Sequence, residues 1–199
     1  MKAPVVIVAL LLVLGIAGAM SSGLFGVGSP LSMPASLQFS GSGARTEQEQ
    51  TPTESAKFLN TSPVSGDKKR LQHPTYGFTV TVPNAMELER YEEGGNSETL
   101  VFFDTNDGIE FQLFVTPYDA SEVTKERLAL DIPSGDIREP QEIVLGNGLR
   151  AFMFLSHAPI VGDTREVWFI HDGYLYEATV AYELDSWLAE ILNTITFTQ

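Results

Sequence analysis

His157 and His171 are the side chains of this 199-residue chain that first invite a shared metal or acid–base site. They end the two runs 149–157 and 163–171, which the sequence pairs as a hairpin. In such a hairpin the two histidines lie at opposite ends of the pair, about 26 Å apart at about 3.3 Å per residue. Ligands of one zinc ion lie about 2.0–2.1 Å from it. The spacing therefore argues against a site that both histidines share.

Other residue types that carry chemistry are scarce or already explained. The chain has no Cys, which excludes a disulfide framework, a thiolate metal site and a cysteine nucleophile. His73 stands beside Pro74 and is interpreted as an exposed residue at the edge of a domain. Neighbouring carboxylates are frequent, as at Glu92 and Glu93, and indicate a solvated acidic face. We therefore predict no catalytic, cofactor-binding or metal-ligating residues.

One loop has an unusual composition for a hairpin tip. The segment 157–162 joins two predicted strands, yet it carries Ile160 and Val161 at its centre, where polar residues are usual. The two side chains either fold back onto the sheet or form an exposed apolar contact for a partner or a lipid. Ile160 and Val161 are therefore the residues predicted as a possible partner contact.

The elements that would position these residues are mostly strands. Apolar and polar residues alternate from Phe78 to Val82 before Pro83, and alternate again over 109–115. The run 98–104 is apolar on both faces at its centre, which is typical of a central strand. Turn residues stand between strands at Asn106-Asp107-Gly108 and at Asp172-Gly173. Further predicted strands are 86–91, 149–157, 163–171, 174–182 and 195–197.

Two helices interrupt the strands. The first is predicted over 121–131, with Asp119 or Ser121 as its N-cap. The second has apolar residues at helical spacing from Leu184 to Leu192, with Asp185 or Ser186 as its cap. Strand hairpins alternating with single helices indicate the α+β class, with a mostly antiparallel sheet.

Both ends of this region resemble a known family. The opening Tyr76-Gly77-Phe78 followed by the strand to Pro83, and the closing helix and strand over 184–197, are similar to the ends of PsbP-like domains. The resemblance implies an α/β/α sandwich around an antiparallel sheet, as in the PsbP and Mog1 superfamily. The chain departs from the family at Met86, where a Trp is usual. Family members mostly bind partners or assist assemblies, and no catalytic set is carried over.

Charge and aromatic residues divide the chain at about residue 70. The whole chain has 12 Lys+Arg against 26 Asp+Glu, a formal net charge of −14. Residues 71–199 hold 6 of the basic groups, 22 of the acidic groups and 17 of the 20 aromatic residues. We therefore predict one acidic α+β domain over 71–199. Its charge excludes nucleic acid and an anionic membrane surface as partners, since both require a basic face.

The first 70 residues have a different organisation. Residues 1–20 combine Lys2 with a long apolar run and are predicted as an export signal, cleaved after Ala19, or as a retained membrane anchor. Residues 21–70 are rich in Ser, Gly, Pro, Thr and Gln and are predicted as a disordered linker. Both alternatives for the N-terminus place the domain in an extracytoplasmic compartment, in the cell envelope or secreted.

Two functions from different classes follow from these features. The first is a non-catalytic protein-interaction or assembly module. Its binding partner would be an unidentified basic protein or a cation. The alternative is a carboxylate-dependent extracytoplasmic hydrolase, which would need two acidic groups converging in a cleft. A third interpretation of the acidity is adaptation to high salt. The presence of a single lysine in the domain, Lys125, agrees with it.

Overall fold

The computed structural model describes residues 60–64, 66–132, 136–158 and 161–198. In chain order the elements are β1 (Asn60–Pro63), β2 (Lys68–Gln72), β3 (Phe78–Pro83), β4 (Glu87–Gly94), β5 (Ser97–Asp104), β6 (Ile109–Pro117), α1 (Lys125–Asp131), β7 (Arg138–Val144), β8 (Arg150–Ala158), β9 (Gly162–His171), β10 (Tyr174–Ala181), a 3₁₀ turn (Tyr182–Leu184), α2 (Asp185–Leu192) and β11 (Thr196–Phe197).

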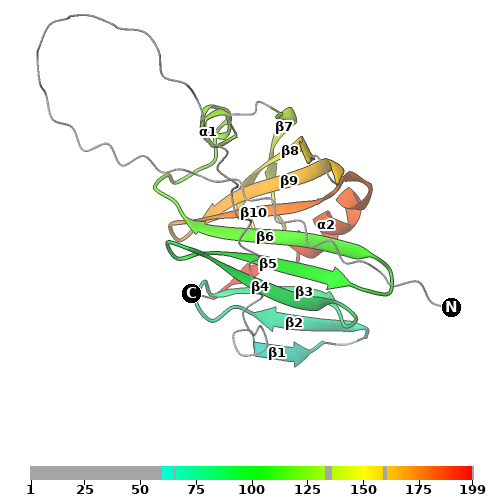
Figure 1. Ribbon diagram of the computed structural model, residues 1–199. Helices are drawn as coiled ribbons and strands as arrows, with labels where there is room; N and C mark the ends of the chain where they lie inside the picture. Colours follow the sequence, from blue (N-terminus) through cyan, green and yellow to red (C-terminus); the bar gives the residue numbers. More distant parts are fainter. Residues whose placement is uncertain (1–59, 65, 133–135, 159–160, 199) are drawn as a thin grey trace, which may run out of the picture. The chain divides into compact units, whose positions relative to one another are not determined.

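The strands form two antiparallel sheets (Figure 1). The larger sheet has the order β4-β5-β6-β10-β9-β8-β7 and the smaller one the order β1-β2-β3-β11. The predicted turn between β9 and β10 is confirmed: Asp172 has φ 49° and Gly173 has φ 78°. Positive φ at both central residues is the requirement of a type I′ hairpin turn, which Asp-Gly satisfies with little strain.

The core lies on both faces of the large sheet. On one face it packs against the small sheet and α2, because Phe78, Val80 and Val82 alternate inward along β3 and join the buried face of α2 in one cluster. On the opposite face Leu128 of α1 and the nearby Ile132 pack on aromatic residues of β8 and β9. The amphipathic spacing predicted for α2 is confirmed, since its buried residues are Leu188, Ile191 and Leu192.

The α+β class and the antiparallel sheet are confirmed, but an α/β/α sandwich is not what the described residues form. α1 has 7 residues and α2 has 8, which is too short for helices to cover both faces of a sheet of 7 strands. The small sheet shares one face with α2 instead. The part of the chain that the structure describes is therefore mostly strand.

The boundaries of several elements also differ from the prediction. β1 and the first three residues of β2 lie in the last part of the predicted linker. β2 buries only Leu71 fully and is otherwise a polar, Lys-rich segment, so its strand character is not apparent from the sequence. α1 begins at Lys125, with the Thr124 side chain accepting a hydrogen bond from the backbone N–H of Arg127, so the caps predicted at Asp119 and Ser121 are wrong. Leu184 precedes α2 with no side-chain cap.

The predicted signal or anchor at 1–20 and the linker up to residue 59 lie outside the described residues. Among the residues that are described, no helix combines the length and apolar character needed to cross a membrane.

Candidate functional site

The apolar tip between β8 and β9 was the predicted partner contact. Val161 exposes 41% of its surface, whereas Ile160 lies outside the described residues. The contact therefore stays a prediction. What the structure does show is how the two strands are held where the loop begins and ends.

An ion pair closes the base of this loop. Arg138 of β7 donates to both carboxylate oxygens of Asp163, at 2.8 and 3.2 Å, and to the carbonyl oxygen of Ser156 at 2.8 Å. His157 Nδ1 lies 3.0 Å from the same carboxylate. The hydrogen bond from Arg138, followed by that of His157, lowers the pKa of Asp163 to about 2. These side chains are exposed, so the pair links β7 to the adjoining ends of β8 and β9 and adds little stability.

Replacing Arg138 with glutamine is expected to return the pKa of Asp163 from about 2 toward the ordinary value of 3.8. The reason is that the substitution removes the charge and the two-point contact that stabilise the carboxylate. Titration of the Asp163 carboxyl carbon by NMR measures this shift. Arg150→Gln is the matched control, since its carboxylate partner is Glu122. An Asp163 pKa that stays near 2 in Arg138→Gln would contradict the assignment.

The separation of His157 and His171 is confirmed. His157 pairs with Asp163 at one end of the β8–β9 ladder, and His171 lies at the other end, opposite Tyr174 of β10. The ring of His171 packs against Phe197, with 3.7 Å between ring centroids. Within the described residues, no three His, Asp or Glu side chains are grouped so that they could hold a metal ion.

The interpretation of His73 as an exposed residue is wrong. His73 is 1% exposed and follows β2, where its ring stacks between those of Tyr76 and Phe78. Its Nδ1 accepts hydrogen bonds at 3.3 Å from the backbone N–H groups of Thr75 and Tyr76. Because Nδ1 accepts, Nε2 is the protonated nitrogen, and it lies 2.5 Å from Oε1 of Glu98 on β5.

Glu98 is the centre of this buried cluster. Its second oxygen, Oε2, accepts a hydrogen bond from Nε of Arg90 on the neighbouring strand β4. Burial raises the pKa of Glu98, but the hydrogen bonds and charges of His73 and Arg90 outweigh burial, so the pKa lies below its ordinary value. The carboxylate stays ionised with both oxygens occupied. We therefore assign the cluster to the joint between the small sheet and the edge of the large one, and not to catalysis.

A second pair of buried carboxylates lies on the opposite face of the large sheet. Glu166 of β9 and Glu177 of β10 are 6% and 5% exposed. Glu166 accepts hydrogen bonds from the hydroxyls of Thr179, at 2.6 Å, and Thr164, at 2.9 Å. Oε1 of Glu177 has no hydrogen-bond partner among the described residues. Burial raises the pKa of both groups, and the charges of Glu166 and Asp131 raise that of Glu177 further.

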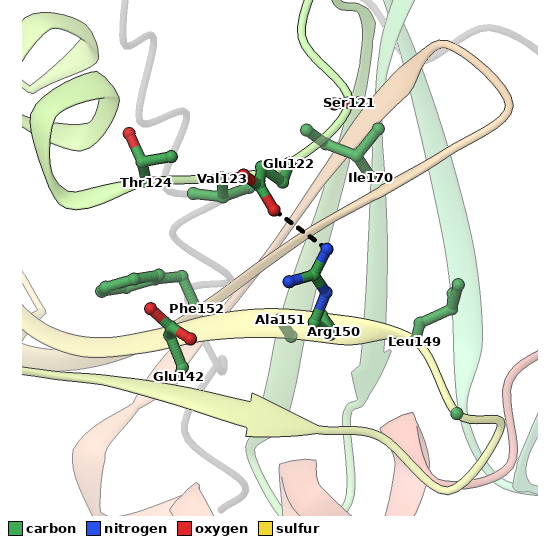
Figure 2. A pocket seen from close by; sticks show the side chains of 11 residues that line it. Ser121, Glu122, Val123, Thr124, Glu142, Leu149, Arg150, Ala151, Phe152 and Ile170 are labelled. Atoms are coloured by element: carbon green, nitrogen blue, oxygen red, sulfur yellow. Dashed lines mark ion pairs between the residues drawn. The ribbon is translucent and has the colours of Figure 1, made fainter.

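These two carboxylates do not line the pocket that residues before α1 form with β7, β8 and β9. The side pocket, as we call it, is lined by residues 121–124, 148–152, Glu142 and Ile170 and has a volume of about 410 Å³ (Figure 2). Its carboxylates are Glu122 and Glu142. Glu166 and Glu177 instead lie beneath the surface with their pKa values shifted in the same direction. The arrangement that a carboxylate hydrolase needs, two acidic groups with divergent pKa values in an open cleft, is not formed by these residues.

The arginines of the domain are paired with carboxylates of the same domain. Each arginine after residue 70 contacts a carboxylate: Arg90 with Glu98, Arg127 with Asp131, Arg138 with Asp163, Arg150 with Glu122, and Arg165 with Asp185. Before the domain core, Lys69 of β2 donates to the backbone carbonyl oxygens of Asn84 and Met86. The basic side chains are thus largely engaged within the domain, and the acidic surplus is left for the surroundings.

Neither the His73–Glu98–Arg90 cluster nor the Glu166–Glu177 pair is predicted from the sequence. Only one signal for either was present: each Glu stands in an otherwise apolar or β-prone run, at Glu98 before Thr-Leu-Val-Phe-Phe and at Glu177 between Tyr176 and Ala178. A charged residue on the inward-facing register of a buried strand needs a partner or a shifted pKa. The strand register shows that Glu98 has partners and that Glu177 has a shifted pKa.

No protein-family model matches the chain, and neither does any curated protein sequence. Among solved structures, the chain is similar to the solution structure of cyanobacterial PsbP (CyanoP) from Synechocystis sp. PCC 6803. The sequence identity is 10% and the TM-score 0.47, and the match covers 70% of this chain and 98% of the other. The predicted resemblance to PsbP-like domains agrees with this match, which concerns the fold.

Proposed function

We propose that this chain is a non-catalytic interaction or assembly module, displayed outside the cytoplasm, that binds a basic protein. The observation that carries the proposal is the internal pairing of the arginines described above. It leaves an acidic surface that attracts a partner of opposite charge and repels nucleic acid and anionic membranes.

Exposed carboxylates support this reading in number and in distribution. They occur on strands, turns and helices, and the following have no ion pair among the described residues: Glu87, Asp107, Glu126, Glu139, Glu142, Glu183 and Glu190. The apolar N-terminal run supports the extracytoplasmic location, as an export signal or as an anchor. The linker that follows would then let the domain reach a partner away from the membrane.

The binding proposal is tested with the full-length protein carrying a C-terminal affinity tag. Envelope extract of the source cells is passed over the immobilised protein at about 0.1 M and at about 1 M salt, where the Debye length falls from about 10 Å to about 3 Å. We expect the retained proteins to be basic and to be released at high salt. Retention of one partner at both salt concentrations would contradict an electrostatic interaction.

The location is tested separately. Mass spectrometry of the mature protein from fractionated cells identifies its first residue, and the fraction shows its compartment. A chain that begins after Ala19 in the secreted or periplasmic fraction, or an intact chain in the membrane fraction, agrees with the proposal. An intact chain in the cytoplasmic fraction would contradict it.

A further inference from the structure

The side pocket combines an apolar floor with charged groups at its mouth. Its floor is formed by Phe152 of β8, which is buried, and by Ile170 of β9, which share one face of the sheet. Its mouth lies between the segment before α1, which carries Glu122, and the strand β7, which carries Glu142 (Figure 2). A pocket of about 410 Å³ with these walls has room for one large side chain of another protein.

The charges at the mouth are unequal. Arg150 points toward Glu122, and its guanidinium lies 2.9 Å from that carboxylate, with 75% of the Arg150 side chain and 53% of the Glu122 side chain exposed (Figure 2). Glu142 has no ion-pair partner among the described residues. It stands directly across the β7–β8 ladder from Phe152, on the same face of the sheet. The pocket therefore offers one free carboxylate at the edge of its apolar floor.

We propose that the side pocket binds an arginine side chain of the basic partner, with its guanidinium on Glu142 and its methylene stem over Phe152 and Ile170. Long cationic side chains bury their stems on apolar surface while the charged head stays at the rim. The planar guanidinium donates two parallel hydrogen bonds to one carboxylate, which a lysine ammonium does not do. This inference rests on the proposed function, since it assigns the site at which the basic partner is recognised.

Glu122 is the second carboxylate that could accept hydrogen bonds from the guanidinium, and it is paired with Arg150. An ion pair between two exposed side chains contributes little free energy, so an incoming guanidinium competes for Glu122 at small cost. Removing Arg150 should then free Glu122 and strengthen the binding of a cation. A pocket meant for an anion would behave in the opposite way, because Arg150 would be its anchor.

The test follows the backbone amide signals of the ¹⁵N-labelled full-length protein by NMR. The probe is an acetylated and amidated peptide, Gly-Arg-Gly-Arg-Gly. We expect the largest shifts at Gly148, Leu149 and Arg150. Glu142→Gln should weaken binding about two- to fivefold, the range of one exposed ion pair. Glu190→Gln, on the exposed side of α2, removes the same charge outside the pocket and should have a smaller effect.

A second pair of variants tests for an increase in peptide affinity. Arg150→Gln should strengthen binding about two- to threefold by freeing Glu122. Lys68→Gln, in the exposed part of β2, makes the same change in net charge and should have less effect. The same peptide with lysine in place of arginine should bind more weakly than the arginine peptide. All these residues are exposed, and the dispersion of the amide spectrum shows that each variant is folded.

The outcomes separate the site from the function. Equal weakening by Glu142→Gln and Glu190→Gln, or weaker binding by Arg150→Gln, would overturn the pocket while leaving a diffuse acidic surface that still binds a basic partner. Equal affinity for the lysine and arginine peptides would overturn the choice of arginine. Failure of both basic peptides to bind at low salt would overturn both the pocket and the basic partner.

Discussion

Glu98→Ala is expected to lower the free energy of unfolding by about 3–5 kcal/mol, the usual effect of removing one partner from a buried ion pair. The carboxylate is fully buried, accepts a hydrogen bond from Arg90 and lies 2.5 Å from Nε2 of His73. Its removal would leave the Nε2–H of a buried imidazole without an acceptor, and would leave the guanidinium of Arg90, whose side chain is 13% exposed, without its buried counter-charge.

Urea unfolding monitored by Trp fluorescence measures this effect. Glu92→Ala is the matched control, because Glu92 also contacts Arg90, at 3.4 Å, but is 59% exposed. We expect Glu92→Ala to change the unfolding free energy by less than about 0.5 kcal/mol. Comparable losses in the two variants would show that Arg90 depends on its charge partners in general and not on the buried one.

The same carboxylate should make stability depend on acid. Because the pKa of Glu98 is lower in the folded protein than in the unfolded chain, its contribution is fully present above the unfolded pKa of about 4.3. It is lost as the pH falls through the lower, folded pKa. Glu98→Gln carries no such charge, so its stability should decline less steeply than that of the wild type below about pH 4.5.

Much of the large sheet could be predicted from local sequence, because hairpin turns and alternation are local properties. Asn106-Asp107-Gly108 lies between the paired strands β5 and β6, and Asp172-Gly173 between β9 and β10. In contrast, β7 is an edge strand of the large sheet and is mostly polar, with no fully buried residue. Its position depends on its pairing with β8, which no short window of sequence contains.

The candidate sites depended even more on long-range contacts. His73 and Glu98 are 25 positions apart and meet only because the small sheet packs on the face of β5 that carries Glu98. Glu142 is recognised as a pocket residue only from its register with Phe152 and from the position of residues 121–124. A surplus of acidic residues was visible from composition. The structure was needed to tell which carboxylates are buried, paired or free, because this depends on the register of the strands and on which face of each helix is buried.

Glu177→Gln is expected to raise the free energy of unfolding at pH 7 by about 1–3 kcal/mol, the range of most single substitutions at buried positions, because an ionisable carboxyl is more costly to bury than a neutral amide. Burial raises the pKa of Glu177 well above its ordinary value, and Glu166 and Asp131 add repulsion. Glutamine has the same shape and no charge, so it removes the cost of burying an ionisable carboxyl and the repulsion from its neighbours while leaving the packing on β10 unchanged.

The sign of the pH dependence distinguishes this effect from a change in packing. Below the unfolded pKa of about 4.3, folded and unfolded chains both hold the proton, and the carboxyl costs the fold nothing extra. As the pH rises, the unfolded chain releases its proton first, so stability is lost until the pH has passed the raised folded pKa. The gain from Glu177→Gln should therefore be largest at neutral pH and nearly absent at pH 4.

Two further variants complete the test by urea unfolding at pH 4 and pH 7. Glu183→Gln removes an exposed carboxylate near the end of β10 and should change stability by less than about 0.5 kcal/mol at either pH. Glu166→Gln should give a smaller gain than Glu177→Gln, because both oxygens of Glu166 already accept hydrogen bonds from threonine hydroxyls. A gain at Glu177 that is equal at both pH values would locate the effect in packing. A loss at pH 7 would mean that the carboxylate of Glu177 has a partner in solution.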